Sequence, residues 1–265
     1  MISDTQAGGS VASTEVLMNS MLGGLRWGLD RMLAVGYGVA YDYIFERFGP
    51  YQTLKSEVLD LVGASVPEGV SRRDVRVLDI ACGPGNMTIT LAEAGFSVVG
   101  VDPYGALVEV AREKRRARHL ANLAFREGDL ARGSAFASVT FDQVVNIHSL
   151  YLHPEPRRLL REACRVLKPG GTAIFVNRAR RISHWSTLRT LQAGEGSRAA
   201  LRSLLWVAPN SIFEALRRPT GEPHYWDEDA FGQALQEAGF TVLGLRRTFL
   251  EGSSLLALAR RDTGE

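Results

Sequence analysis

An aspartate followed by a glycine-rich turn is the first group of residues whose types and spacing could do chemistry. In the stretch VLDIACGPGN, residues 77–86, Asp79 lies four positions before Gly83, and Gly85 follows. Glycine has no Cβ, so the backbone can turn sharply and approach a ligand closely, and the helix expected next presents free N–H groups. Asp102, 19 positions after Gly83, ends the next apolar run, where a carboxylate can accept two hydrogen bonds from a ribose diol. The spacing predicts a site for an adenosine ligand.

The residues around the turn favour a cationic adenosine ligand over a dinucleotide. A dinucleotide fingerprint has a third small residue three positions after the second glycine, and here that position is Thr88. The negative charge of Asp79 would repel a pyrophosphate, and no Gly-Lys-Ser/Thr follows to form a phosphate loop. An anionic side chain at this place suits a ligand that carries positive charge.

Further polar residues follow the third and fourth apolar runs. Asp129 could hydrogen-bond an adenine edge and Leu130 could pack on its face, although Asp129 could equally cap the short helix expected next. His148 and His153 lie in NIHSLYLHPEP, just past the fourth run, and imidazole is a common general base. His184, further along the chain, is a third candidate base.

An alternation of strands and helices must position these residues. Short runs rich in Val, Ile and Phe predict strands at 75–80, 97–102, 123–128, 141–146 and 171–177, with helical patterns between them. This order predicts right-handed crossovers and a parallel sheet covered on both faces, with ligands beyond the carboxyl ends of its strands. A helix at 227–240 and two strands at 240–249 and 254–260 predict a terminal hairpin at the sheet edge.

The composition and patterning indicate one main domain with additions. Residues 1–14 are expected to be a disordered leader, 15–66 a helical cap, and 67–265 the core, with 178–226 inserted on the substrate side. Of the 265 residues, 45% are apolar, which allows a sizeable core. Cys82 and Cys164 give neither a disulfide framework nor a metal-ligand cluster, so we expect a cytoplasmic protein without a metal. No uncharged run approaches the ~20 residues of a membrane span.

Taken in order, these motifs resemble those of class I S-adenosylmethionine-dependent methyltransferases. VLDIACGPGN resembles the first motif of the family, with Ala81 in place of its usual first glycine, VVGVDP the acidic second motif, and EGDL the adenine-contacting loop. The stretch from FDQVVN to GTAIFVN resembles the fourth strand, its helix and the Lys-Pro-Gly-Gly turn into strand five. Tyr41 matches a Tyr-Asp pair that often precedes the first motif. The resemblance covers residues 75–178 and the last forty.

The resemblance implies a fold, a cofactor and the residues that bind it. The implied α/β fold is Rossmann-like, with a seven-stranded, mostly parallel sheet, an antiparallel last strand and helices on both faces. The implied cofactor is S-adenosylmethionine, and the product is S-adenosylhomocysteine. Its methionine part would face Asp79 and the turn, its ribose the second motif, its adenine the EGDL loop, and its ammonium group the backbone oxygens at the end of strand four. The implied cofactor-binding residues are Asp79, Ala81, Cys82, Gly83, Gly85, Asp102, Pro103, Asp129, Leu130, Asn146, Ile147 and Tyr41.

The sequence contains fewer specific signals for the residues that would bind the methyl acceptor. Methyl transfer is an in-line displacement, to O, N or C, which a positioned base assists when the acceptor must lose a proton. His148 and His153 are the catalytic candidates, although His153 matches a position where many small-molecule members carry a mainly structural histidine. The substrate-side candidates are Tyr37, Tyr151, Asn177, His184 and Trp185.

Local charge is the remaining clue to the acceptor. Residues 172–218 contain eight arginines and two glutamates, a net charge of +6. This charge could attract an anionic acceptor, although solvated helix faces explain the arginines equally well. The basic run 112–118 is assigned to an external helix face. We therefore expect a small organic acceptor, anionic or amphiphilic, no nucleic-acid partner, and a monomer or homodimer. A phospholipid head-group N-methyltransferase in contact with a membrane surface, an RNA methyltransferase and a non-catalytic subunit remain alternatives.

Overall fold

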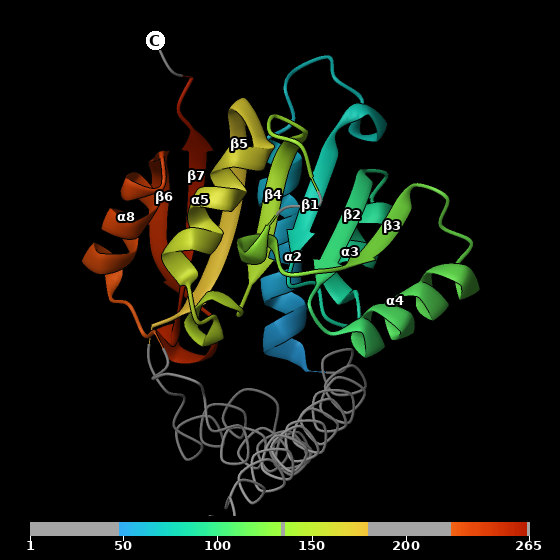
Figure 1. Cartoon of the computed structure of the whole chain (residues 1–265), viewed down its shortest axis with the longest axis horizontal. Helices are drawn as coiled ribbons and strands as arrows, with labels where there is room; N and C mark the ends of the chain where they lie inside the picture. The colour runs from blue at the N-terminus through green and yellow to red at the C-terminus, as the bar shows by residue number, and fades with distance from the viewer. Residues whose placement is uncertain (1–47, 134–135, 180–223, 264–265) are drawn as a thin grey trace, which may run out of the picture.

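One mixed sheet of seven strands organises the part of the chain that the computed structural model describes, residues 48–133, 136–179 and 224–263 (Figure 1). The strand order is β3-β2-β1-β4-β5-β7-β6, with β7 antiparallel to both neighbours and the other strands parallel to one another. The predicted fold class is confirmed. The strands are β1 (Arg76–Ile80), β2 (Ser97–Asp102), β3 (Leu123–Glu127), β4 (Phe141–Ile147), β5 (Leu167–Arg178), β6 (Phe240–Thr248) and β7 (Ser254–Arg261).

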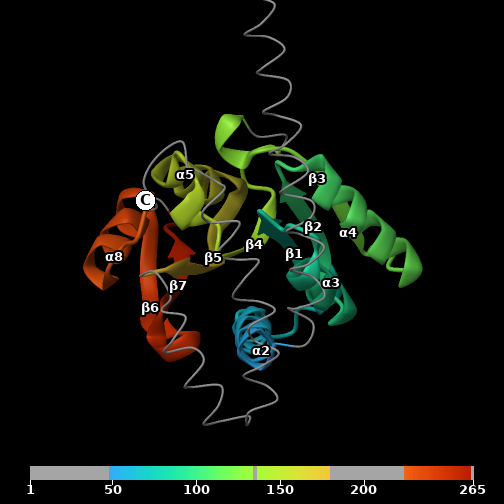
Figure 2. The same cartoon turned by 90° about the horizontal axis from the view of Figure 1, so that it is seen from below.

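Helices cover both faces of the sheet, with short 3₁₀ turns at several strand ends (Figure 2). On one face, α2, α3 and α4 contribute Val58, Leu91 and Val108 to one core cluster, and on the other, α5 and α8 contribute Leu159 and Phe231 to a second cluster. The helices are α2 (Gly49–Ala64), α3 (Asn86–Glu93), α4 (Gly105–Ala117), α5 (Pro156–Val166) and α8 (Glu228–Glu237), and the 3₁₀ turns are η1 (Arg72–Asp74), η2 (Leu130–Arg132), η3 (Leu150–Leu152) and η4 (Leu250–Gly252).

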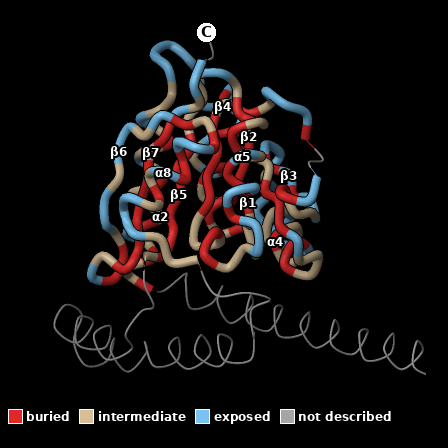
Figure 3. The backbone as a smooth tube through the Cα atoms, turned by 60° about the vertical axis from the view of Figure 1, so that its left-hand side comes forward, coloured by how far each residue is buried: buried red, intermediate tan, exposed pale blue. Residues whose placement is uncertain are grey.

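The point where the strand order reverses places the glycine turn. β1 pairs with β2 on one side and with β4 on the other, so that Asp79 lies opposite Gly100 and Val145. Buried side chains line both faces of these central strands, whereas much of the edge strand β6 is exposed (Figure 3). Ligands of open α/β sheets bind beyond the carboxyl ends of the strands at such a reversal. The turn after β1 opens at this place.

Two predicted boundaries differ from the structure for local reasons. β5 begins at Leu167, four residues before the predicted strand, because Leu167 already pairs with Phe141 before the Lys-Pro-Gly-Gly turn shifts the register. α8 is shorter than the predicted helix 227–240. Asp227 accepts a hydrogen bond from the N–H of Ala230 as its N-cap, and Gly239, with a φ of +93°, lies beyond its C-terminal end.

Several expectations concern residues outside the described part of the chain. They are the leader 1–14, most of the cap 15–66, the inserted residues 180–223, and the side chains of Tyr37, Tyr41, His184 and Trp185. The division into a cap, a core and an insertion therefore stays a prediction. Within the described ranges, the helices are too short or too polar to cross a membrane.

Candidate active site

The turn after β1 combines an open position with a tightly packed one. Ala81, Gly83 and Gly85 all have positive φ, at 56°, 55° and 83°. A Cβ at Gly83 would meet no atom within 4 Å, so the backbone there borders open space, whereas at Gly85 it would come within 2.7 Å of the Phe125 ring. Gly83 thus leaves room for a ligand, and Gly85 is required by packing against β3. Ala81 adopts the left-handed conformation at a cost of roughly 1 kcal/mol.

Asp79 is buried beneath this turn and has one close partner. Its side chain is 3% exposed, and its Oδ2 accepts a 2.6 Å hydrogen bond from the hydroxyl of Thr88 on α3. Burial, with a smaller contribution from the nearby charge of Asp102, raises the pKa of Asp79 to about 7 against the lowering effect of the hydrogen bonds from Thr88. The carboxyl is therefore poised to ionise when positive charge approaches. The contact with Thr88 is absent from the sequence prediction, which used Thr88 only to exclude a dinucleotide.

Asp102 at the end of β2 joins the second motif to the first. Its Oδ2 accepts a 2.9 Å hydrogen bond from the N–H of Gly83, and its Oδ1 accepts one of 2.9 Å from the N–H of Tyr104. These backbone donors fix the orientation of the carboxylate beside the glycine turn. The structure therefore brings Asp102 and the glycine turn together, as the spacing predicts. Pro103, between Asp102 and Tyr104, is exposed.

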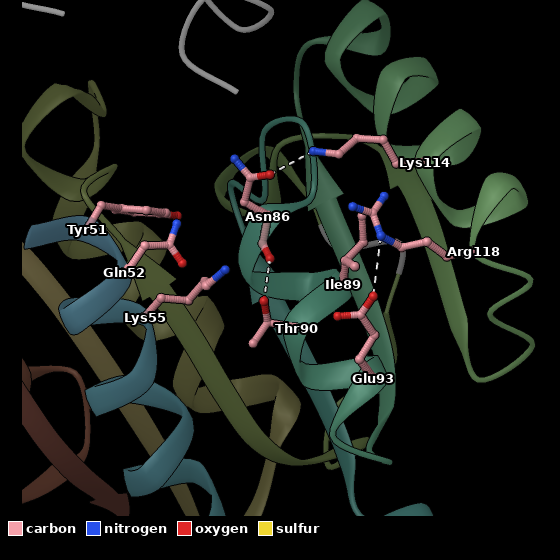
Figure 4. A pocket seen from close by; sticks show the side chains of 9 residues that line it. All are labelled: Tyr51, Gln52, Lys55, Asn86, Ile89, Thr90, Glu93, Lys114 and Arg118. Carbon is pink, nitrogen blue, oxygen red and sulfur yellow. Dashed lines mark hydrogen bonds and ion pairs between the residues drawn. The ribbon is translucent and has the colours of Figure 1, made fainter. Parts of the chain in front are cut away.

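Lys114 on α4 holds the far side of the same turn (Figure 4). Its Nζ donates hydrogen bonds to the Pro84 carbonyl oxygen, at 3.1 Å, and to Oδ1 of Asn86, at 2.7 Å. The assignment of the run 112–118 to an external face was wrong for this residue, because Lys114 points inward beside a small hollow of about 70 Å³ between α2, α3 and α4. Sequence reasoning missed it because its partners lie 30 and 28 positions away.

Asp129, at the end of the turn after β3, is linked to His153. Oδ1 of Asp129 accepts a 2.9 Å hydrogen bond from the N–H of Ala131, which is the capping role left open by the sequence, and lies 3.2 Å from Nε2 of His153. Nδ1 of His153 accepts from the N–H of Glu155 at 3.0 Å, so this network assigns the proton to Nε2. Both ring nitrogens are engaged. Leu130, beside them, is 3% exposed.

The carboxyl ends of β4 and β5 carry a second polar group. Nε2 of His148 lies 2.9 Å from Oγ of Ser254, and its ring centroid lies 5.0 Å from that of Phe249. Burial, assisted by the positive charge of Arg178, lowers the pKa of His148 to about 3. The imidazole is therefore neutral at physiological pH. Arg178 is only 1% exposed, and its guanidinium lies 4.9 Å from the centroid of the Tyr151 ring.

Two asparagines at this edge are buried with incomplete hydrogen bonding. Asn146 donates from Nδ2 to the Ile80 carbonyl oxygen at 2.8 Å, and to Ser149, which ties β4 to β1. Its Oδ1, and both amide atoms of Asn177, find no hydrogen-bond partner within the described ranges. Ile147 is partly buried and packs against the core beneath α2. Buried amides of this kind are available to a ligand or to ordered water.

Tyr151 and Cys82 are less available than the sequence suggests. Tyr151 is 4% exposed, and its ring lies parallel to that of Tyr225, with centroids 5.8 Å apart. The Cys82 thiol points toward Gly100 and Phe125, where burial raises its pKa well above the usual range. The backbone of Cys82, rather than its thiol, is therefore the part that a ligand could meet.

Comparison with known proteins identifies the domain to which this turn belongs. Residues 77–171 match the family model of a methyltransferase domain. A demethylmenaquinone methyltransferase of Shouchella clausii is 36% identical over 100 residues, which are 37% of this chain and 42% of that protein. The chain contains a class I S-adenosylmethionine-dependent methyltransferase domain. It spans less than half the length of that relative, so the comparison concerns the methyltransferase domain and not the whole protein.

Other known proteins extend the comparison of the methyltransferase domain. A 23S rRNA (uracil(1939)-C(5))-methyltransferase of Xylella fastidiosa is 41% identical over 91 residues, 34% of this chain and 19% of that protein. Among solved structures, magnesium protoporphyrin IX methyltransferase from Synechocystis PCC 6803 has a TM-score of 0.56 at 19% identity, covering 80% of this chain and 84% of that one. The latter likeness shows a shared fold.

The residues of the methyltransferase domain fit S-adenosylmethionine by charge and by shape. The open space at Gly83 lies next to the fixed Asp102 carboxylate, which matches a ribose and the chain attached to it. Asp79 lies beneath the same turn, where its carboxyl can ionise beside a cationic ligand. The unpartnered Oδ1 of Asn146 adds an acceptor at the end of β4. These groups would hold the cofactor.

Proposed function

We propose that this chain is a methyltransferase that moves the methyl group of S-adenosylmethionine to a small organic acceptor. The single observation that carries the proposal is the contact of Asp102 with the N–H of Gly83 at the reversal point of the sheet. This contact supports the proposal because a carboxylate at the end of the second strand, the position suited to a ribose diol, lies against an open glycine turn inside a domain that matches methyltransferases. When bound, the cofactor supplies an electrophilic methyl group on a positively charged sulfur.

In this proposal, three aspartates of the chain each lie beside a different part of the cofactor. Asp79 faces its charged methionine end, and the carboxyl loses its proton there because positive charge lowers the pKa that burial has raised. Asp102 accepts hydrogen bonds from the ribose. Asp129 and Leu130 lie beside the adenine, and His153 holds Asp129 in place through its Nε2 proton. His153 thus acts as a positioning residue.

On the acceptor side, we assign His148 an aligning role. Methyl transfer needs an in-line approach and exclusion of water more than it needs acid or base. A base works best when its pKa lies near the operating pH, and the pKa of His148 lies far below it. Its neutral ring, held by Ser254, can hydrogen-bond an acceptor group at the end of β4.

The acceptor is proposed to be anionic or amphiphilic. The buried cation Arg178 at the end of β5, and the positive field that it exerts on His148, support an acceptor with negative charge. The family match over residues 77–171 covers the glycine turn, β2 and β4. It therefore favours the cofactor more strongly than any one acceptor, including the quinones and RNA named for the relatives.

Calorimetric titration tests the proposed function directly. We expect the full chain to bind S-adenosylmethionine and S-adenosylhomocysteine and to leave NAD unbound, because Asp79 opposes a pyrophosphate. Turnover is then followed as S-adenosylhomocysteine formed with a panel of small acids, phenols and amines, vesicles of phospholipid, and an RNA transcript. Binding of NAD in place of both methionine-derived ligands would overturn the proposal. Cofactor binding without turnover on any of these would favour a non-catalytic subunit.

A further inference from the structure

A second hollow lies at the N-terminal end of α5, away from the glycine turn. It has a volume of about 370 Å³ and is bounded by the first turns of α5 on one side and by His224 and Trp226 on the other. This volume is in the range of small-molecule sites. Figure 1 shows α5 lying across β4 and β5, whereas the glycine turn leads into α3 behind the sheet. None of the proposed cofactor or acceptor residues lines this hollow.

The lining of this hollow is strongly basic. Arg157, Arg158 and Arg161 line it together with one carboxylate, Glu155. Arg157 is occupied, because it pairs with Glu237 and lies over the Trp226 ring. Arg158 reaches Glu155 only at 3.5 Å, and Arg161 has no ion pair within the described ranges. Arg161 therefore remains for another anion, and Arg158 can join it because its contact with Glu155 is long.

The two remaining arginines are suitably arranged for one oxyanion. Arg158 and Arg161 are three positions apart on α5, so they project from the same face of the helix. Guanidinium groups offer planar pairs of N–H donors that match the oxygens of a phosphate. A phosphate monoester carries about −1.5 to −2 charges near pH 7, so it offers several charged acceptor oxygens to these donors.

The opposite wall is held in place by contacts of its own. The N–H of His224 donates to the Tyr151 carbonyl oxygen at 2.8 Å, and the Trp226 ring is stacked on Phe231 with centroids 5.8 Å apart. Arg157 covers the Trp226 ring as well, at 5.9 Å from its centroid. A wall fixed before binding lowers the entropic cost of binding. The apolar parts of this wall, together with Pro154 and Pro156 at the start of α5, suit the organic part of an ester.

From these observations we propose that the hollow at the start of α5 binds a small phosphate monoester through Arg158 and Arg161. The phosphate lies between the two guanidinium groups, and the organic part lies toward Trp226. The site is separate from the proposed cofactor site and does not depend on the proposed function.

Phenyl phosphate is the probe for this site, with inorganic phosphate and phenol as its two halves. We expect calorimetry of the full chain at low salt to show binding of phenyl phosphate, weaker binding of inorganic phosphate, and none of phenol. The double variant Arg158→Gln, Arg161→Gln should weaken phenyl phosphate binding by about tenfold or more, because hydrogen bonds to charged groups are lost. These side chains are exposed, so the fold should persist, which a thermal melt checks.

A matched control separates a built site from general charge. Arg116→Gln removes an equally exposed arginine from α4, and we expect phenyl phosphate affinity to stay within about twofold. Equal weakening by Arg116→Gln and by the double variant would overturn the proposal, as would absence of phenyl phosphate binding to the unmodified chain. Inorganic phosphate binding as tightly as the ester would contradict a site for the organic part. S-adenosylhomocysteine is titrated on the same samples, so failure of the proposed function is seen separately.

Discussion

At the scale of single residues, the site depends on carboxyl groups held in different environments. Asp102 is fixed by the backbone N–H groups of two residues, whereas Asp79 is buried with Thr88 as its hydrogen-bond partner. Burial raises the pKa of the Asp79 carboxyl, so its charge depends on what lies beside it. The same residue type therefore provides an acceptor oriented by the backbone at Gly83 and an adjustable charge under the turn.

Asp79 should make the stability of the free protein depend on pH. Its pKa is about 7 in the folded chain against 3.8 ordinarily, so the folded state retains a proton that the unfolded state loses. The favourable contribution is complete below about pH 4 and is lost as the pH rises to 7, by up to ~4 kcal/mol at 1.36 kcal/mol per pKa unit. Urea unfolding of the wild type and of Asp79→Asn at pH 5 and pH 8 measures this.

The asparagine variant cannot ionise, so it should gain stability relative to the wild type between pH 5 and pH 8. A difference between the two proteins that stays constant over this range would show that Asp79 titrates normally in the folded chain. Asp227→Asn is the matched control, because it makes the same change at an exposed helix cap.

At the scale of elements, α4 contributes to the site from a distance. Lys114 is tied to the turn at Pro84 and Asn86, although α4 follows β2 and not β1. The turn therefore has supports on two sides, with the Asp102 carboxylate at Gly83 and the Lys114 ammonium at Pro84. Support of this kind fixes the groups that contact a ligand.

Removing the ammonium should loosen the turn without unfolding the chain. We expect Lys114→Met to weaken S-adenosylhomocysteine binding by about tenfold, because two hydrogen bonds from a charged donor are lost. Arg116→Met, an exposed change on the same helix, should leave that affinity nearly unchanged. Calorimetry measures the affinity of both variants for S-adenosylhomocysteine, and equal values would show that Lys114 does not support the cofactor site.

The elements were predictable where local pattern determines them. β2 spans Ser97–Asp102 as predicted, because an apolar run ends at an acid followed by Pro103. β5 was placed too short, since its pairing before the Lys-Pro-Gly-Gly turn is set by β4 and not by its own sequence. The contacts Asp79–Thr88 and Lys114–Asn86 depend on how α3 and α4 pack, which side-chain periodicity does not encode.

At the scale of the whole molecule, the carboxyl ends of the central strands bring the two proposed halves of the site to one edge of the sheet. The reversal between β1 and β4 opens the proposed cofactor side, where Asp79, Asp102 and Gly83 converge. The ends of β4 and β5 bring His148 and Arg178 to the proposed acceptor side. β7 inserts between β5 and β6, and its first residue, Ser254, holds His148. The terminal hairpin thus has a direct part in the site.

A crystal structure of the complex with S-adenosylhomocysteine tests whether the turn after β1 binds the cofactor. We predict its ribose diol against Asp102, its methionine end over Gly83 and Asp79, and its sulfur toward the end of β4 near His148. A ligand whose ribose lies away from Asp102, or one bound outside the turn after β1, would contradict the proposed cofactor site.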